Sequence, residues 1–319
     1  MPLSPGNEPV DLNNYTGNLY EGNYIWSGAM NLCWTNLSQV IIKEPISIKT
    51  DEAEALKMMD KFNHPVCTTR DLDEPSYYIK AGMGPKTLEA INRESREKFP
   101  QKSFGDLEMS IGEDEFISYA YFFKKVSYEK PFTLNDVYFD NTWVKGFEAA
   151  DEQKRTVEVL NYDNDDRFII RLRLKSAGDE LILAKGYPTE EPSVVMAALN
   201  QDPDQKNNRL SDDDHFMMPL LHLSCRRDYE ELIGKAFANP GFTGYIIGAM
   251  FENINFDLDE EGAKVESQAV MSVERGAAPQ KTGRYFYLNK PFWVIMKRKD
   301  SSNPYFLLGV NNHQLMQKK

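Results

Sequence analysis

One short stretch of the chain gathers imidazole, hydroxyl and thiol groups that could do chemistry. His215, His222 and Cys225 are zinc-ligand types, but the paired cysteines typical of structural zinc sites are absent. On a strand, Ser224 would share a face with His222, as a nucleophile and its base require, and Cys225 would point away. No third group to orient the histidine is evident. We therefore expect structural or surface roles here, with no catalytic residue, metal or cofactor.

The common enzyme signatures are missing elsewhere in the sequence. It contains no Gly-x-Ser-x-Gly elbow, phosphate-binding glycine loop, dinucleotide fingerprint or His-Glu-x-x-His motif. The adjacent carboxylates Glu260 and Glu261 could act as acid and base, but such clusters in an acidic chain are usually solvated. The sequence does not predict an enzyme, and an enzyme on an unrelated α+β fold is a distant alternative.

A stretch near the C-terminal end changes from a strand pattern to an exposed loop. From Ala263 the residues alternate, which places Val265, Ser267 and Ala269 on the same face as Ala263. Residues 275–283 are polar and rich in turn formers, and Pro279 cannot donate to a central ladder. Such a loop is suited to presentation to a binding partner.

Several stretches of the chain resemble, in the same order, the serpin family of protease inhibitors. They are residues 23–30, residues 118–132 with their terminal Pro-Phe, the acidic hinge Glu260-Glu261-Gly262, residues 289–292 and the closing Phe-Leu-Leu-Gly-Val at 306–310. The resemblance implies an α+β fold with a helical front half, a large central mixed sheet, additional sheets and an exposed reactive-centre loop. It also implies a flexible tail at residues 1–22 and a single domain over 23–319, with the loop at about 260–288.

A serpin-like function would be inhibition by a conformational trap. A protease cleaves the loop, and the upstream arm inserts as a new strand into the central sheet. The hinge residues would be Glu260, Glu261, Gly262, Ala263, Val265, Ser267 and Ala269, whose inward members are small and uncharged.

The scissile bond of the loop follows from the same resemblance. Counting about fifteen residues from Glu260 reaches Arg275-Gly276, and a basic side chain suits the acidic pocket of a trypsin-like protease. Lys281 and Arg284 are the fallback scissile residues. A trypsin-like serine protease is the favoured partner, and a cysteine protease is the alternative.

Three residues depart from the family pattern where the sheet must open. The usual asparagine and histidine are replaced by Ala120 and Glu252, and the usual tryptophan before Pro-Phe is replaced by Tyr128. The front end also offers fewer helices than the family has. The competing function is therefore a serpin-like protein that does not inhibit and serves as a binding or chaperone-type module.

Periodicity gives a coarse view of the elements that position the loop. We expect helices at residues 26–40, 51–62 with Thr50 as cap, 85–98, 193–199 and 229–237. We expect strands at 116–125, 137–139, 142–147, 155–161, 168–174, 217–224 and 251–258. Helices followed by mixed strands and helices predict an α+β fold.

Composition limits the partners and the compartment. The net charge is −12, which gives no electrostatic reason to expect nucleic acid or an anionic membrane. Three cysteines, Cys33, Cys67 and Cys225, without short spacing fit a reducing environment. Because the N-terminal residues lack a signal-peptide pattern, we expect a cytoplasmic protein, with an extracellular location left open. We also expect a monomer.

Overall fold

The computed structural model describes residues 14–101, 105–200, 209–263 and 283–319. The chain forms two compact units, each assembled from three stretches of sequence. Unit 1 comprises Met1–Thr16, Ser27–Phe123 and Arg226–Glu252, and unit 2 comprises Gly17–Trp26, Lys124–Cys225 and Asn253–Lys319. The single domain expected over residues 23–319 stays a prediction.

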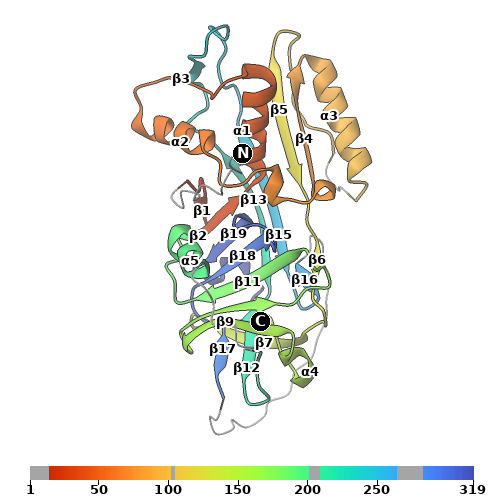
Figure 1. Cartoon of the computed structure of the whole chain (residues 1–319), viewed down its shortest axis with the longest axis vertical. Helices are drawn as coiled ribbons and strands as arrows, with labels where there is room; N and C mark the ends of the chain where they lie inside the picture. Colours follow the sequence, from red (N-terminus) through yellow and green to blue (C-terminus); the bar gives the residue numbers. More distant parts are fainter. Residues whose placement is uncertain (1–13, 102–104, 201–208, 264–282) are drawn as a thin grey trace, which may run out of the picture. The chain divides into compact units, whose positions relative to one another are not determined.

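Unit 1 holds the three longer helices and two small sheets (Figure 1). Its elements are α1 (Ala29–Leu37), η1 (Ser38–Ile42), β3 (Ile48–Lys49), α2 (Ala53–Asn63), η2 (Thr69–Asp71), η3 (Glu74–Ser76), β4 (Tyr77–Met83), α3 (Pro85–Lys98), β5 (Phe116–Phe122) and β14 (Ala236–Phe237). β4 pairs antiparallel with β5, and β3 pairs with β14. α3 packs on β4, where Tyr78 donates to the Glu94 carboxylate at 2.9 Å.

An aromatic core holds α1 and α2 together. The rings of Trp34 and Phe62 stack with centroids 5.3 Å apart, and Phe62 meets Tyr229 edge-on at 5.5 Å. All three side chains are buried. The apolar residues of α1 and α2 thus face a shared core, to which Tyr229 also contributes.

Unit 2 is built mainly from strands. They are β1 (Asn18–Tyr20), β2 (Asn23–Ser27), β6 (Val126–Ser127), β7 (Thr133–Phe139), β8 (Thr142–Glu148), β9 (Val157–Asn164), β10 (Arg167–Leu172), β11 (Asp179–Lys185), β12 (His215–Pro219), β13 (Leu221–Asp228), β15 (Phe251–Leu258), β16 (Gly262–Ala263), β17 (Tyr285–Tyr287), β18 (Phe292–Arg298) and β19 (Pro304–Val310). Three of them, β2, β13 and β15, include residues that belong to unit 1. Short helices are α4 (Asp151–Lys154), α5 (Pro192–Leu199) and η4 (His313–Leu315).

These strands form three sheets. The seven-stranded sheet runs β1-β2-β19-β18-β11-β10-β9, and the four-stranded sheets run β17-β12-β8-β7 and β13-β15-β16-β6. Every residue of β11 and β19 is buried, as are the first five of β18. Burial on both faces explains why β18 and β19 are continuous apolar runs instead of alternating ones. The stretch 118–132, which resembles one central-sheet strand, is divided between β5 and β6.

Several expected elements appear with the predicted bounds or close to them. α3 and β15 begin and end as predicted, and α5 begins one residue earlier than predicted. The expected helix over 26–40 becomes β2 followed by α1 and η1, and the expected strand over 217–224 is divided at Leu220 into β12 and β13. Thr50 accepts a hydrogen bond from the Glu52 amide, but α2 begins at Ala53.

The helix expected over 229–237 is wrong. Tyr229 and Leu232 are buried, but the backbone forms turns, and Gly234 has a positive φ of 81°. A strand, β14, occupies the end of the stretch. Apolar spacing here reflects burial of a turn-rich segment, which periodicity cannot distinguish from a helix.

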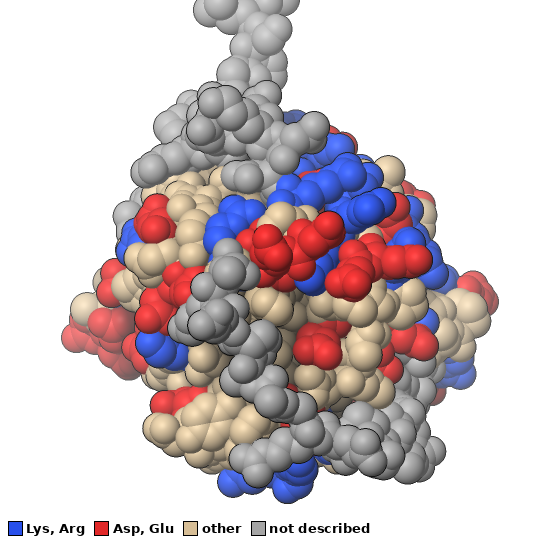
Figure 2. Space-filling view, turned by 90° about the horizontal axis from the view of Figure 1, so that it is seen from below, with Lys and Arg blue, Asp and Glu red and all other residues tan. Residues whose placement is uncertain are grey.

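None of the helices in the described part of the chain is long and apolar enough to cross a membrane. On the face shown in Figure 2, acidic and basic side chains lie intermixed. That face presents alternating charge and not one extended basic surface.

Candidate functional site

The hinge begins with a tight acidic turn after β15. The carboxylate Oδ1 of Asp259 accepts hydrogen bonds from the amides of Glu261 at 2.9 Å and Gly262 at 3.0 Å. The Asp259 amide donates to the Gly262 carbonyl at 2.9 Å. An aspartate that bonds amides two and three residues ahead reverses the chain without other support. The hinge therefore turns back along β15.

The first residues after this turn lie as a strand between two others. Ala263 is opposite Leu258 of β15, and β16 pairs antiparallel with Val126 and Ser127 of β6 on its other side. Gly262 has a φ of +155°, and a Cβ there would lie 2.2 Å from the Val126 carbonyl oxygen. Only glycine fits this contact. The start of the hinge is thus inserted between β15 and β6.

Only the first residue of the expected inward face of the hinge, Ala263, lies among the described residues. Ala263 is 2% exposed, as an inserted strand requires. Val265, Ser267 and Ala269 lie outside the described residues, as do the candidate scissile residues Arg275, Gly276 and Lys281.

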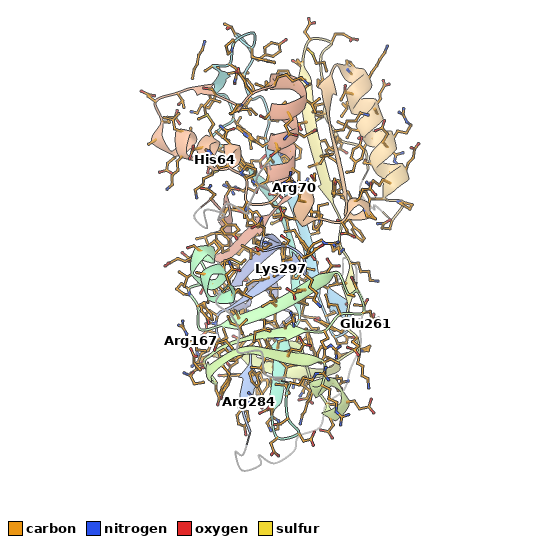
Figure 3. All side chains as sticks on the ribbon, viewed as in Figure 1. His64, Arg70, Arg167, Glu261, Arg284 and Lys297 are labelled. Carbon is orange, nitrogen blue, oxygen red and sulfur yellow. The ribbon has the colours of Figure 1, made fainter. Side chains whose placement is uncertain are left out.

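The two hinge glutamates act through their backbones. The Glu260 carbonyl accepts from the Phe132 amide at 2.8 Å, and the Glu261 carbonyl accepts from the Tyr128 amide at 2.9 Å. Burial raises the pKa of the Glu260 carboxyl, and the neighbouring carboxylates add to the rise. The Glu261 side chain is exposed (Figure 3). The Pro-Phe segment and the hinge therefore hold each other directly.

The downstream end of the loop is held by an ion pair. Arg284 binds the Asp214 carboxylate through Nε at 3.1 Å and Nη2 at 2.7 Å, and its amide donates to the same carboxylate at 2.9 Å. Burial opposes ionisation of Asp214, but hydrogen bonds from Arg284 and Ser211 outweigh it and lower its pKa to about 2. Arg284, a fallback scissile residue, is thus engaged within the protein.

Two of the residues that depart from the family pattern are buried polar groups. In unit 1, the Glu252 carboxylate accepts hydrogen bonds from the hydroxyls of Ser27 and Tyr229. In unit 2, the Tyr128 side chain is fully buried, and its hydroxyl has no hydrogen-bond partner among the described residues. The third, Ala120, lies in β5 opposite Ile79 of β4. The first two substitutions place ionisable or polar groups where burial makes them costly.

The nucleophile candidates do not form a catalytic pair. His222 Nδ1 bonds the Asp257 carboxylate, whereas the Ser224 hydroxyl donates to Asn255 at 2.7 Å. His215 stacks on Tyr285 with centroids 5.0 Å apart. No cluster of three or more metal-ligand side chains occurs in the parts of the chain that the structure describes. His222, Ser224 and His215 therefore each contact a neighbouring side chain, and these contacts give each residue a structural role.

Sequence reasoning missed two features of the site. Asp214 and Arg284 are 70 residues apart, and Ser27 and Glu252 are 225 apart. Neither pair has a local spacing that could be recognised, because only the tertiary fold brings the two residues of each pair together.

Comparisons with known proteins place the chain near two groups. No family model matches it. It is similar to the superinfection exclusion proteins of monkeypox virus and of vaccinia virus strain Copenhagen, with 22% identity over 197 residues in both cases. The matches cover 51% of this chain and 51% and 52% of those proteins, so the chain spans about half the length of the curated relatives it matches.

Among solved structures, the chain is similar to three serpins. Human glycosylated kallistatin is 18% identical with a TM-score of 0.43, over 70% of this chain and 63% of that one. Thyroxine-binding globulin in complex with thyroxine is 12% identical with a TM-score of 0.46, over 91% of this chain and 92% of that one. SRPN18 from Anopheles gambiae is 12% identical with a TM-score of 0.43, over 70% of this chain and 65% of that one. In this chain, β2 followed by α1, β5 and β6 before Pro131-Phe132, the hinge β16, and the final strands β18 and β19 occur in the order that the resemblance implies.

Proposed function

We propose that this chain, whose α+β fold is of the serpin type, is a protease inhibitor that acts as a suicide substrate. One observation carries the proposal: Gly262 and Ala263 are already paired between β15 and β6. To admit a new strand, two neighbouring strands must separate, which breaks the ladder hydrogen bonds between them. Gly262 and Ala263 occupy such a position between two strands at the hinge end, which supports the proposal.

The residues after Ala263 have the chemistry that further insertion needs. Val265, Ser267 and Ala269 continue its face with small, uncharged side chains, so no charge would be buried if they followed it. Lys264 and Glu266 fall on the alternate face. Insertion up to Ala269 is therefore compatible with the sequence.

The proposed trap follows from cleavage in the loop. The protease serine oxygen attacks the carbonyl carbon of Arg275 and the bond to the Gly276 nitrogen breaks. The serine proton passes to that nitrogen, which becomes a free amine, and an ester joins Arg275 to the protease. Insertion of the upstream arm then carries the acylated protease away from the geometry its deacylation requires. A trypsin-like enzyme is the favoured target because its pocket accepts a basic residue, and a cysteine protease would form the analogous thioester.

The test is a denaturing gel of the purified protein incubated with trypsin at near-equal ratio. We expect a band that survives boiling and contains both proteins. Ala263→Glu should remove that band and leave cleavage intact, because it places a charge between two strands. Ala150→Glu makes the same change at an exposed position and should retain the band. Cleavage of the wild type without a covalent band would reject the trap.

A non-inhibitory binding or chaperone-type function is the main alternative. It is favoured by Glu252 and Tyr128, which place buried polar groups where the family's sheet opens. The alternative would be supported by clean cleavage of the wild type, together with suppression of aggregation of a second, heat-treated protein.

Both forms of the proposal describe a monomeric cytoplasmic protein. Sedimentation would check the monomeric state, and cell fractionation would check the location.

A second candidate function comes from the matched relatives, whose name states superinfection exclusion. The observation in its favour is the match over 197 residues. Cells that express the chain would be challenged with a fluorescent reporter poxvirus, and fewer infected cells are expected. Ala263→Glu would then show whether the effect depends on the inserted hinge.

A further inference from the structure

Four basic residues lie between Ala263 and β17, namely Lys264, Arg275, Lys281 and Arg284, and a trypsin-like protease could cut after any of them. We propose that Asp214 is a specificity-determining residue: by binding Arg284 it withdraws that side chain from proteases and confines cleavage to bonds upstream of Gly283. The inference rests on the proposed function of the loop as the segment that a target protease cleaves. It assigns to Asp214 a role beyond holding the fold.

The geometry of the Asp214–Arg284 clamp leaves little of the guanidinium available. Both carboxylate oxygens are used, at 3.1 Å and 2.7 Å, in the fork arrangement that suits arginine and that lysine cannot reproduce. The side chain of Asp214 is 3% exposed and that of Arg284 is 29% exposed. The guanidinium also lies 5.4 Å from the ring centroid of Tyr162 and 5.2 Å from that of Phe286. A protease pocket would have to break all of these contacts.

The backbone on either side of Arg284 is also held. Tyr285 to Tyr287 pair in parallel with β12, and the Arg284 carbonyl accepts from the His215 amide at 2.9 Å. The Tyr285 amide donates to Asp165 at 3.0 Å. A Cβ on Gly283 would lie 1.6 Å from the Asp213 carbonyl oxygen, so the chain just before β17 lies in close contact with the residues just before β12. Proteases bind substrates in extended form with free backbone groups, which this segment lacks.

The position of the cut decides whether a trap can work. Cleavage after Arg284 would lengthen the upstream arm and sever it at the strand that anchors the loop. A clamp on Arg284 prevents this unproductive cut.

The experiment maps trypsin cuts in the native full-length chain by mass spectrometry at short digestion times. In the wild type we expect cuts upstream of Gly283 at these short times, and cleavage after Arg284 only at much longer times. Asp214→Asn should make the bond after Arg284 cleavable, about 10- to 100-fold faster than in the wild type, since it removes a charge-assisted pair from a locally opening segment. Asp163→Asn is the control, because Asp163 pairs with Arg167 at 3.1 Å with both side chains 49% exposed.

A second variant keeps the test decisive if Asp214→Asn does not fold. Arg284→Lys retains a residue that trypsin accepts but loses the fork, so it should also be cut at this position. Rapid wild-type cleavage after Arg284, or no cleavage there in the folded variants, would overturn the inference. The cut map does not depend on a covalent complex. Upstream cleavage without that complex rejects the trap and leaves the clamp in place.

Discussion

At the scale of single residues, Tyr128 is a buried hydroxyl without a hydrogen-bond partner among the described residues. Its ring packs edge-on against Phe132 with centroids 4.8 Å apart. Tyr128→Phe keeps that contact and removes the unpaired group, so we expect the free energy of unfolding to rise by about 1 kcal/mol. Urea unfolding would measure the change. Tyr138→Phe is the control, since Tyr138 is 44% exposed, and an equal gain there would contradict the explanation.

Glu252 should make stability depend on pH. Burial raises the pKa of its carboxyl, and hydrogen bonds from Ser27 and Tyr229 and the charge of Arg227 offset only part of that rise. The folded state therefore holds the proton more tightly than the unfolded state. Stability from this group is complete below the unfolded value of 4.5 and is lost as pH rises through the higher folded pKa.

Glu252→Gln keeps hydrogen-bonding capacity and removes the charge. It should match the wild type at pH 4 and be more stable at neutral pH, with the difference growing above about pH 4.5. Thermal unfolding across this range would measure it. Cys33 and Tyr229 also lie close enough to interact with Glu252, so both should remain unchanged in the variant. Glu230→Gln, at an exposed position nearby, is the control; parallel profiles for Glu252→Gln and wild type would contradict the assignment.

At the scale of elements, a row of ion pairs joins four neighbouring strands of the seven-stranded sheet. Arg171 of β10 bonds Glu158 of β9 at 2.6 Å and also pairs with Glu180 of β11, which binds Lys297 of β18 at 2.9 Å. Arg171→Ala would leave Glu180 with one partner at a buried position, and we expect a loss of about 2 kcal/mol. Arg96→Ala breaks a pair whose side chains are 59% and 58% exposed and should cost under about 1 kcal/mol. Chemical unfolding of both variants tests the contrast.

How far the sequence predicts these elements depends on where their contacts come from. α3 and β15 follow from local periodicity, and both have the predicted bounds. The stretch over 229–237 fails because its apolar residues are buried by tertiary contacts in a turn. The hinge turn at Asp259 to Gly262 has a local cause in its own residues. The Asp214–Arg284 clamp has none, since β12 and β17 must meet before it exists.

At the scale of the whole molecule, cleavage of the loop should raise thermal stability. If the arm follows Ala263 inward, new ladder hydrogen bonds and burial of Val265 and Ala269 would contribute about 4 kcal/mol. In a protein of 319 residues that corresponds to a rise in Tm of about 6 °C. Calorimetry of the intact and the trypsin-nicked protein would measure it. Ala263→Glu supplies the matched comparison, because its nicked form should show no rise. A wild-type Tm unchanged or lowered by nicking would mean that the arm stays outside the sheet, and the binding-module alternative would then hold.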